Sequence, residues 1–179
     1  MSIYIVTDST CDLTEAMIGD RPITVLPLYI NIEGRSYLDG VDLSHAEFYQ
    51  RLPTLRAAPT TSAPSIGTLV ELYRRLAAAG ATAIISIHIA DALSNTGNVA
   101  RLAAQAVTEV PVTVFDSGQI TLGIGHMVLA AGDAARRGAS VEEILALCHD
   151  LRKRSYSFAA ADTLEYLRRS GRLSHVQAS

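Results

Sequence analysis

Residues 3–10, which read Ile3-Tyr4-Ile5-Val6-Thr7-Asp8-Ser9-Thr10, join a short apolar run to a polar turn. A continuous apolar run of this length is typical of a strand that is buried on both faces, as in a parallel sheet. The pattern returns twice, where apolar residues at 83–89 lead to 93–97 and apolar residues at 112–115 lead to 116–118. We therefore predict three buried strands that each end in small polar residues.

Helical periodicity fills the segments between these strands. Apolar residues recur three and four positions apart over 69–79, and Gly80 follows as a helix stop. Further helices are predicted from about residue 96 to 107, over 122–137, and from the capping box at Ser140 to about residue 153. Because parallel strands need helical crossovers, the sequence predicts an α/β fold, with a mostly parallel sheet and helices on both faces.

Several shorter elements complete this prediction. The segment 23–32 is predicted to form a strand that bends at Pro27, because proline belongs at a sheet edge or bulge. The sequence from Ser44 to Glu47 fits a capping box and predicts a helix to about residue 52. The remaining elements are a short helix capped by Asp12 or Thr14, a short strand that ends near residue 37, a strand over 157–160 and a helix over 164–169.

Composition narrows the classes of function. The 179 residues are 49% hydrophobic and 18% charged, which is typical of a globular chain, and we expect one domain over residues 1–179. A net charge of −3 and the absence of Trp argue against nucleic acid as a partner and allow no more than transient membrane contact. No apolar run approaches the ~20 residues of a membrane span, and no secretory signal pattern is visible. We therefore expect a cytoplasmic protein.

Small hydroxyl residues gather where the predicted strands end. Ser9 follows the first strand, residues 94–96 follow the second, Ser117 follows the third, and residues 60–65 precede a helix. Because ligands of parallel sheets bind beyond the carboxyl ends of the strands, these hydroxyls are expected to share one edge. None of the four segments contains Lys or Arg, which favours a ligand held by neutral donors, such as a single carboxylate. Plain helix capping explains each segment taken alone.

The sequence contains no complete motif for an enzymatic function. Asp8 and Asp116, together with Asp12, could hold Mg²⁺ for phosphoryl transfer, although caps and turn bonds account for these residues. Ser94 with His88 could form an activated nucleophile, but neither a G-x-S-x-G sequence nor an acidic partner is identifiable, and we expect His88 to be packed with one hydrogen bond. Gly123-Ile124-Gly125 lacks the third glycine of a dinucleotide site and indicates close packing or a flexible helix entry. We predict no metal site and no cofactor.

Six pieces of sequence stand in a characteristic order over nearly the whole chain. They are Val6-Thr7-Asp8-Ser9-Thr10-Cys11-Asp12-Leu13, Leu26-Pro27-Leu28, Thr61-Ser62-Ala63-Pro64-Ser65, Ile87-His88-Ile89 leading to Leu93-Ser94-Asn95-Thr96, Asp116-Ser117 with Gly123 and Gly125, and Asp162-Thr163-Leu164-Glu165-Tyr166-Leu167 running to Gly171-Arg172-Leu173. Together they resemble the DegV family, whose members include the fatty-acid-binding subunits of bacterial fatty acid kinase.

The resemblance implies a function that is not enzymatic. It implies that Thr61 and Ser94 hydrogen-bond the carboxylate of a long-chain fatty acid, with Ser62, Thr96 and Ser9 as neighbours in the same site. A separate ATP-dependent fatty acid kinase would be the partner that makes the acyl phosphate. Two alternatives stay open, which are the Mg²⁺-dependent phosphoryl transfer described above and a regulatory domain with a vestigial pocket.

Three positions depart from the family pattern. Ala63 replaces the Gln of T-S-Q-P-S, Asn95 replaces the Gly after Ser94, and Ser170 replaces the first Gly of G-G-R. Asn accepts a positive φ better than most residues, so we expect the turn at residue 95 to survive. Family members are longer and carry a second α/β domain, so this chain is expected to correspond to the N-terminal domain alone.

Overall fold

The computed structural model describes residues 2–158 and 160, which form two compact units. Unit 1 comprises residues 2–26 and 64–157, and unit 2 comprises residues 27–63 with 158 and 160. Residues 27–63 are therefore inserted into the chain of unit 1. The division concerns compactness alone, and one family domain over residues 1–179 stays a prediction.

Unit 1 is built on a parallel sheet of four strands in the order β2-β1-β6-β7. The strands are β1 (Ile3–Asp8), β2 (Ile23–Leu26), β6 (Ala83–His88) and β7 (Val112–Asp116). In the central pair, β1 runs beside β6 with Ile3 opposite Ala83 and Thr7 opposite Ile87. Every residue of β6 is buried, which accounts for its nearly continuous apolar sequence. The predicted α/β fold with a parallel sheet is confirmed.

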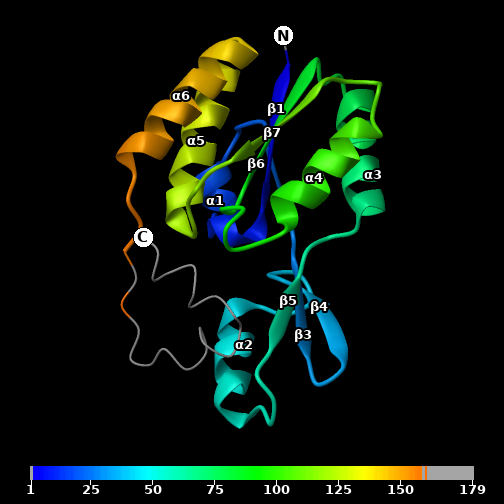
Figure 1. The fold of residues 1–179 in the computed structure, drawn as a ribbon, viewed down its shortest axis with the longest axis vertical. Coiled ribbons are helices and arrows are strands. Elements are labelled where there is room, and N and C mark those ends of the chain that lie inside the picture. The colour runs from blue at the N-terminus through cyan, green and yellow to red at the C-terminus, as the bar shows by residue number, and fades with distance from the viewer. Residues whose placement is uncertain (1, 159, 161–179) are drawn as a thin grey trace. The chain divides into compact units, whose positions relative to one another are not determined.

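Helices cover both faces of this sheet (Figure 1). The helices of unit 1 are α1 (Glu15–Ile18), α3 (Ile66–Ala78), α4 (Thr96–Gln105), α5 (Leu122–Arg136) and α6 (Val141–Arg154). Helices α5 and α6 pack on one face, while α3 and α4 pack on the other. The predicted helix starts at Thr14 and Ser140 are confirmed, because both hydroxyls accept a backbone N–H of the first turn.

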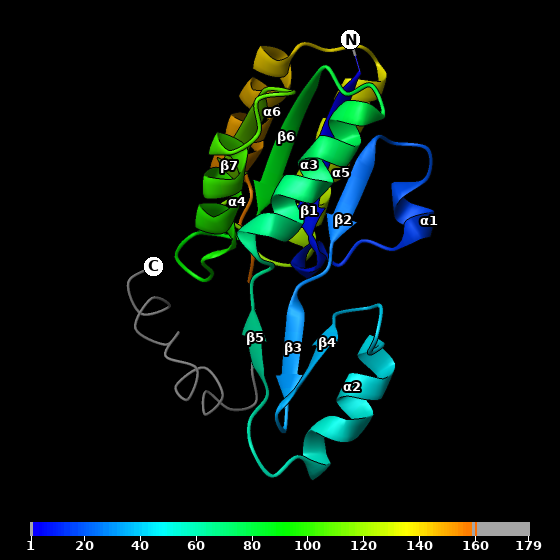
Figure 2. The same ribbon diagram turned by 90° about the vertical axis from the view of Figure 1, so that its right-hand side faces the viewer.

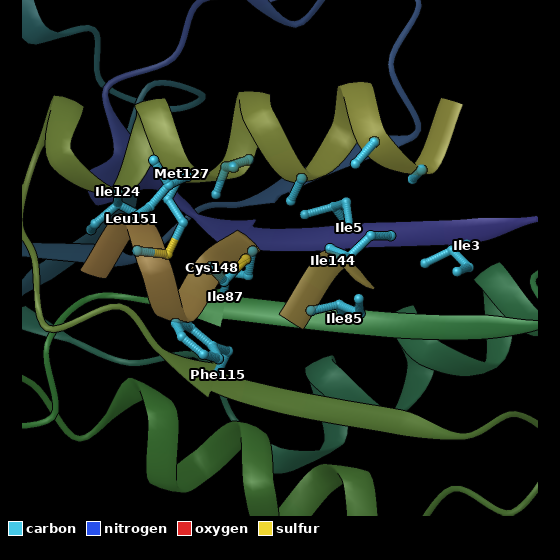
Figure 3. Close-up of a cluster of buried hydrophobic side chains, with 14 of the residues drawn as sticks. Ile3, Ile5, Ile85, Ile87, Phe115, Ile124, Met127, Ile144, Cys148 and Leu151 are labelled. Atoms are coloured by element: carbon cyan, nitrogen blue, oxygen red, sulfur yellow. The ribbon is translucent and has the colours of Figure 1, made fainter. Parts of the chain in front are cut away.

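The core on the α5 and α6 face shows how strand alternation builds the packing (Figure 3). Ile5, Ile85 and Ile87 project from β1 and β6 toward Ile124 of α5 and Cys148 of α6. Burial raises the pKa of the Cys148 thiol to about 12, so this cysteine acts as a small apolar side chain.

A glycine brings α5 against the segment that follows β1. A Cβ at Gly125 would lie 2.5 Å from the carbonyl oxygen of Cys11, so only glycine allows this approach. Gly123 is similarly close to Ser157, where a Cβ would lie 2.7 Å from the side-chain oxygen. Of the two roles predicted for these glycines, close packing is the one that the structure supports.

Unit 2 consists of an antiparallel sheet in the order β4-β3-β5 together with helix α2 (Figure 2). Its elements are β3 (Tyr29–Ile32), β4 (Arg35–Leu38), β5 (Thr60–Ser62) and α2 (His45–Arg51). The capping box of Ser44 and Glu47 is confirmed at the start of α2. Ile30, Ile32 and Leu43 form the buried cluster of this unit.

The single bent strand predicted over residues 23–32 is wrong. The segment forms β2 in unit 1 and β3 in unit 2, and Pro27 lies between them. Proline cannot continue a ladder of backbone hydrogen bonds, so β2 ends at Leu26 as an edge strand.

The C-terminal predictions fall mostly outside the described residues. Ser157, Phe158 and Ala160 belong to no strand, so the strand predicted over 157–160 is not formed at these three positions. The helix predicted over 164–169 and the family motif at 162–173 lie outside the described residues. Across the portion that the structure describes, no helix has both the length and the apolar character needed to cross a membrane.

Candidate functional site

A buried carboxylate closes the end of β1. Asp8 is inaccessible to solvent, and its Oδ2 contacts His88 Nδ1 at 2.9 Å and accepts from the Ile89 N–H at 3.2 Å. Its Oδ1 accepts from the Thr10 N–H at 3.2 Å and from the Thr10 hydroxyl. Because a carboxylate has about four lone-pair sites, these contacts leave Asp8 no acceptor for a metal ion.

The contacts continue from Asp8 into the sheet. His88 Nε2 lies 2.8 Å from Ser86 Oγ, which lies 2.8 Å from Tyr73 Oη of α3. Both nitrogens of His88 are therefore bonded, and the prediction of one hydrogen bond is wrong. The order Ser86–His88–Asp8 resembles a hydrolase triad. However, Ser86 is completely buried and also contacts Tyr73, so its hydroxyl is not presented to a substrate.

Burial and hydrogen bonding determine the ionisation of Asp8 and Tyr73, the two ends of this chain of hydrogen bonds. Burial alone would raise the pKa of Asp8, but the bonds from His88, Thr10 and Ile89 together hold it below its ordinary value. Burial raises the pKa of Tyr73 to about 12 against the opposing effect of its Ser86 contact. At neutral pH this chain of hydrogen bonds therefore joins the ionised carboxylate of Asp8 to the protonated phenol of Tyr73.

Hydroxyls gather at the N-terminus of α4. Ser94 Oγ lies 2.9 Å from Thr96 Oγ1 and accepts from the Thr96 N–H at 3.3 Å. Asn95, the residue that precedes the helix, makes no side-chain cap and has a φ of −81°. The turn at this position therefore lies in an ordinary backbone region and does not require a positive φ. Ser94 is half-buried and Thr96 is buried.

The first turn of α4 is closely approached by an ion pair. A Cβ at Gly97 would collide with Asp91 Oδ1, and Asp91 Oδ2 accepts from Arg101 Nη2 at 2.7 Å. Glycine at this position therefore lets the Asp91 carboxylate lie directly against the start of the helix.

The residues 60–62 form strand β5 of unit 2, where the sequence predicted a loop. Thr61 pairs with Ile30, while Ser62 pairs with Tyr29. Because strand residues alternate between faces, the side chains of Thr61 and Ser62 project to opposite faces of the sheet. Both residues are exposed, and Asn31 Nδ2 donates to Ser62 Oγ at 3.4 Å.

The last hydroxyl of this segment has a different function. Ser65 precedes α3, and its Oγ accepts from the Thr68 N–H at 3.0 Å. Plain helix capping therefore accounts for Ser65.

The predicted site residues are thus distributed over both units. Ser94 and Thr96 are in contact in unit 1, where Ser9 follows β1 in a short 3-10 turn. Thr61 and Ser62 belong to unit 2.

Asp116, the second candidate magnesium ligand, also has partners for both of its carboxylate oxygens. Asp116 Oδ1 accepts from the backbone N–H groups of Asp91 and Gly118, at 3.1 and 3.0 Å. Its Oδ2 lies 3.2 Å from Arg152 Nη2 in an ion pair. Within the ranges that the structure describes, no three His, Cys, Asp or Glu residues are grouped as metal ligands would be. Turn bonds and an ion pair account for this residue, and the magnesium alternative gains no support.

The sequence prediction missed the chain that joins Asp8 to Tyr73. A signal was available, because Ser86 and His88 are two positions apart in an otherwise apolar strand and therefore share a face. Buried polar side chains require hydrogen-bond partners, but the sequence alone did not indicate which residues supply them.

Comparison with known proteins agrees with the fold. Residues 2–179 match a family model described as an uncharacterised protein of the DegV family. A DegV domain-containing protein of Deinococcus radiodurans is 39% identical over 178 residues, which are 99% of this chain and 63% of that protein. A structure described as fatty acid binding of a DegV family protein from Thermus thermophilus has a TM-score of 0.88 and 39% identity. DegV from Bacillus subtilis, described as a fatty acid binding protein, gives 0.90 and 32%.

Both structural matches cover 99% of this chain and 63% of the solved chain. The chain therefore spans less than two thirds of the length of these relatives.

Proposed function

Because the chain belongs to the DegV family, we propose that it binds a long-chain fatty acid by the carboxylate and presents that carboxylate to a separate fatty acid kinase. The relatives from Thermus thermophilus and Bacillus subtilis, which are described as fatty acid binding, support this proposal. The observation that carries it is the group of hydroxyls at the N-terminus of α4, where Asn95 supplies no side-chain cap.

The N-terminus of α4 suits a carboxylate for two reasons. The helix dipole and the backbone N–H groups of its first turn favour an anion. Ser94 is half-buried, and its hydroxyl is held in place by the two contacts with Thr96. Since a hydroxyl hydrogen rotates, Ser94 can donate to a carboxylate while its oxygen still accepts from the Thr96 N–H. Thr96 and Ser9 are proposed as neighbours that orient this group.

Strand alternation separates the roles of the two hydroxyls on β5. The hydroxyl of Ser62 accepts from Asn31, and Thr61 projects to the other face of the sheet. We assign the direct carboxylate contact to Thr61 and a supporting role to Ser62.

The acyl chain supplies most of the binding free energy in this proposal. At ~0.8 kcal/mol per buried CH₂, a chain of ~14 to 18 carbons outweighs the hydrogen bonds of one carboxylate. The hydroxyls then fix the position of the carboxylate. The kinase would add the phosphoryl group to that carboxylate in the cytoplasm, and this chain would supply no catalytic group.

The first experiment measures fatty acid affinity by titration calorimetry with the native protein. Thr61→Ala and Ser94→Ala should each weaken binding about tenfold or more, since a hydrogen bond to a charged group contributes about 1.5–3 kcal/mol. Thr60→Ala is the matched control, because Thr60 is the same residue type on the same exposed strand and projects to the other face from Thr61.

The fatty acid methyl ester gives a second control. It lacks the anionic carboxylate, so wild type and both variants should bind it with equal affinity. An equal loss for acid and ester would contradict carboxylate recognition by Thr61 and Ser94. Native protein that yields no fatty acid on organic extraction, and gains none on incubation, would refute the binding function.

The kinase step has its own test. Acyl phosphate should form only when the lipid-loaded protein, ATP and a fatty acid kinase are combined. Acyl phosphate formed from ATP by the lipid-loaded protein alone would show that this chain is itself an enzyme.

A further inference from the structure

We propose that Asp8 is a positioning residue for Ser94, and that the bond it accepts from His88 is the last step of a directional chain of buried hydrogen bonds. The chain runs Tyr73–Ser86–His88–Asp8, and all four residues belong to unit 1. Its effect on fatty acid affinity rests on the proposed function, whereas its effect on the backbone at Ser94 does not.

The number of available hydrogens determines which group donates at each contact of this chain of hydrogen bonds. Two contacts, Tyr73–Ser86 and Ser86–His88, need two hydrogens, and the hydroxyls of Tyr73 and Ser86 supply them. Tyr73 then donates to Ser86, and Ser86 donates to Nε2 of His88. The remaining hydrogen of a neutral imidazole is on Nδ1 and is donated to Asp8. This assigns His88 the neutral tautomer that is protonated on Nδ1.

The other arrangements leave a buried hydrogen without an acceptor. If His88 were protonated on both nitrogens, three hydrogens would compete for the two contacts between His88 and Tyr73. The unused hydrogen would belong to a side chain with no exposed surface, because Ser86, His88 and Tyr73 are all inaccessible. A buried donor without an acceptor loses its bond to water and gains nothing in return, so the fully paired arrangement is favoured.

Asp8 also fixes the backbone segment that leads to Ser94. Its Oδ2 accepts from the Ile89 N–H, which is the first backbone group beyond β6. The carbonyl of the next residue, Ala90, accepts from Leu93 at 2.8 Å and from Ser94 at 3.2 Å. A continuous path of hydrogen bonds and one peptide link therefore joins the Asp8 carboxylate to the backbone of Ser94.

The same carboxylate also fixes the turn after β1. Its Oδ1 holds the N–H and the hydroxyl of Thr10, next to Ser9. One buried charge therefore fixes both strand ends of unit 1 that carry candidate carboxylate ligands.

The tautomer is tested on the wild-type protein with ¹⁵N-labelled histidine. At pH 7 the His88 resonances should show a protonated Nδ1 and an unprotonated Nε2. A doubly protonated His88, or a proton on Nε2 alone, would overturn the assigned direction. This measurement needs neither a variant nor a ligand.

The positioning role is tested by comparing Asp8→Asn with Tyr73→Phe. Asn keeps the size of Asp8 but replaces one acceptor oxygen with a donor, so either Ile89 or Thr10 loses its partner. Tyr73→Phe removes one hydrogen bond at the distant end of the chain and leaves the His88 and Asp8 contacts intact. Relative to the other amides of unit 1, exchange at Ile89 and Ser94 should accelerate about tenfold or more in Asp8→Asn and stay unchanged in Tyr73→Phe.

Fatty acid affinity gives the second readout of this pair. Asp8→Asn should weaken binding about tenfold, while Tyr73→Phe should lower stability without changing the affinity of the folded protein. Equal effects of the two variants on exchange at Ser94 would overturn the positioning role and indicate general stabilisation.

Two further results keep the tests of function and positioning apart. If wild type binds no fatty acid, the proposed function fails, and the exchange data still decide the positioning role. If Asp8→Asn does not fold, Thr10→Ala removes one donor to Asp8 and should accelerate exchange at Ile89 more than Tyr73→Phe does. The reverse order would overturn the proposal.

Discussion

The two units differ most in the apolar core that supports them. In the described part of unit 1, a cluster of 16 buried residues lies on one face of the sheet and a cluster of 11 on the other. The cluster described in unit 2 contains three. The unit with the larger apolar core therefore carries Ser9, Ser94 and Thr96, whereas the unit with the smaller core carries Thr61 and Ser62. Segments with few buried contacts open at lower free energy, so the two sets of hydroxyls should differ in local stability.

Matched core truncations should separate the units most strongly. Ile85→Ala in β6 should lower the free energy of unfolding by about 2–5 kcal/mol, because Ile85 is completely buried in the larger cluster. Ile32→Ala in β3 should cost less and accelerate amide exchange mainly in β3, β4 and β5. Urea denaturation and hydrogen exchange measure the two effects. Equal losses, or acceleration across β1 and β6 in Ile32→Ala, would show that the units are equally supported.

Acid should act on unit 1 through Asp8. The pKa of this carboxyl is lowered in the folded state, so its stabilisation is complete above the unfolded value of about 4 and is lost as pH falls through the folded value. Neutralising it leaves buried donors poorly paired, at a cost of about 1–3 kcal/mol.

The experiment compares wild type with Asp8→Asn at pH 6 and pH 3. Wild type should lose more stability on acidification, and exchange in β1 and β6 should accelerate more than exchange in β3. Identical pH profiles for the two proteins would contradict a lowered Asp8 pKa.

Two capping boxes provide the smallest and most closely matched test. Ser44→Ala in unit 2 and Ser140→Ala in unit 1 remove the same bond at the start of a helix, at about 1 kcal/mol each. The Ser140→Ala loss should appear as a shift of the main unfolding transition. The Ser44→Ala loss should appear as faster exchange in α2 with little shift of that transition. If both variants shifted the main transition equally, the two units would unfold as one.

Local chemistry explains which parts of the fold could be predicted. The starts of α2, α3 and α6 depend on a serine and backbone groups within the next three residues, so the sequence contains the whole signal. Strand β6 was predictable because burial on both faces gives it an apolar sequence.

The missed features depend on distant residues. Thr60–Ser62 has no apolar alternation, and it becomes a strand only because β3 provides backbone partners. Likewise, Asp8 and His88 are 80 positions apart, and no pattern within either segment indicates the contact. For unit 1, the sequence indicated Ser9, Ser94 and Thr96 as candidate hydroxyls, but it did not indicate the contact between Asp8 and His88.

The insertion of residues 27–63 into unit 1 has a consequence for biosynthesis. Strand β1 is made first, but its central neighbour β6 begins only at Ala83, after the whole insertion has been translated. The strands of unit 2 find their partners within a much shorter stretch of chain, and local pairing is the faster process. The inserted sheet should therefore form on the ribosome while β1 and β2 still lack their cover. During that interval the nascent chain exposes apolar strands, which makes it a substrate for chaperones.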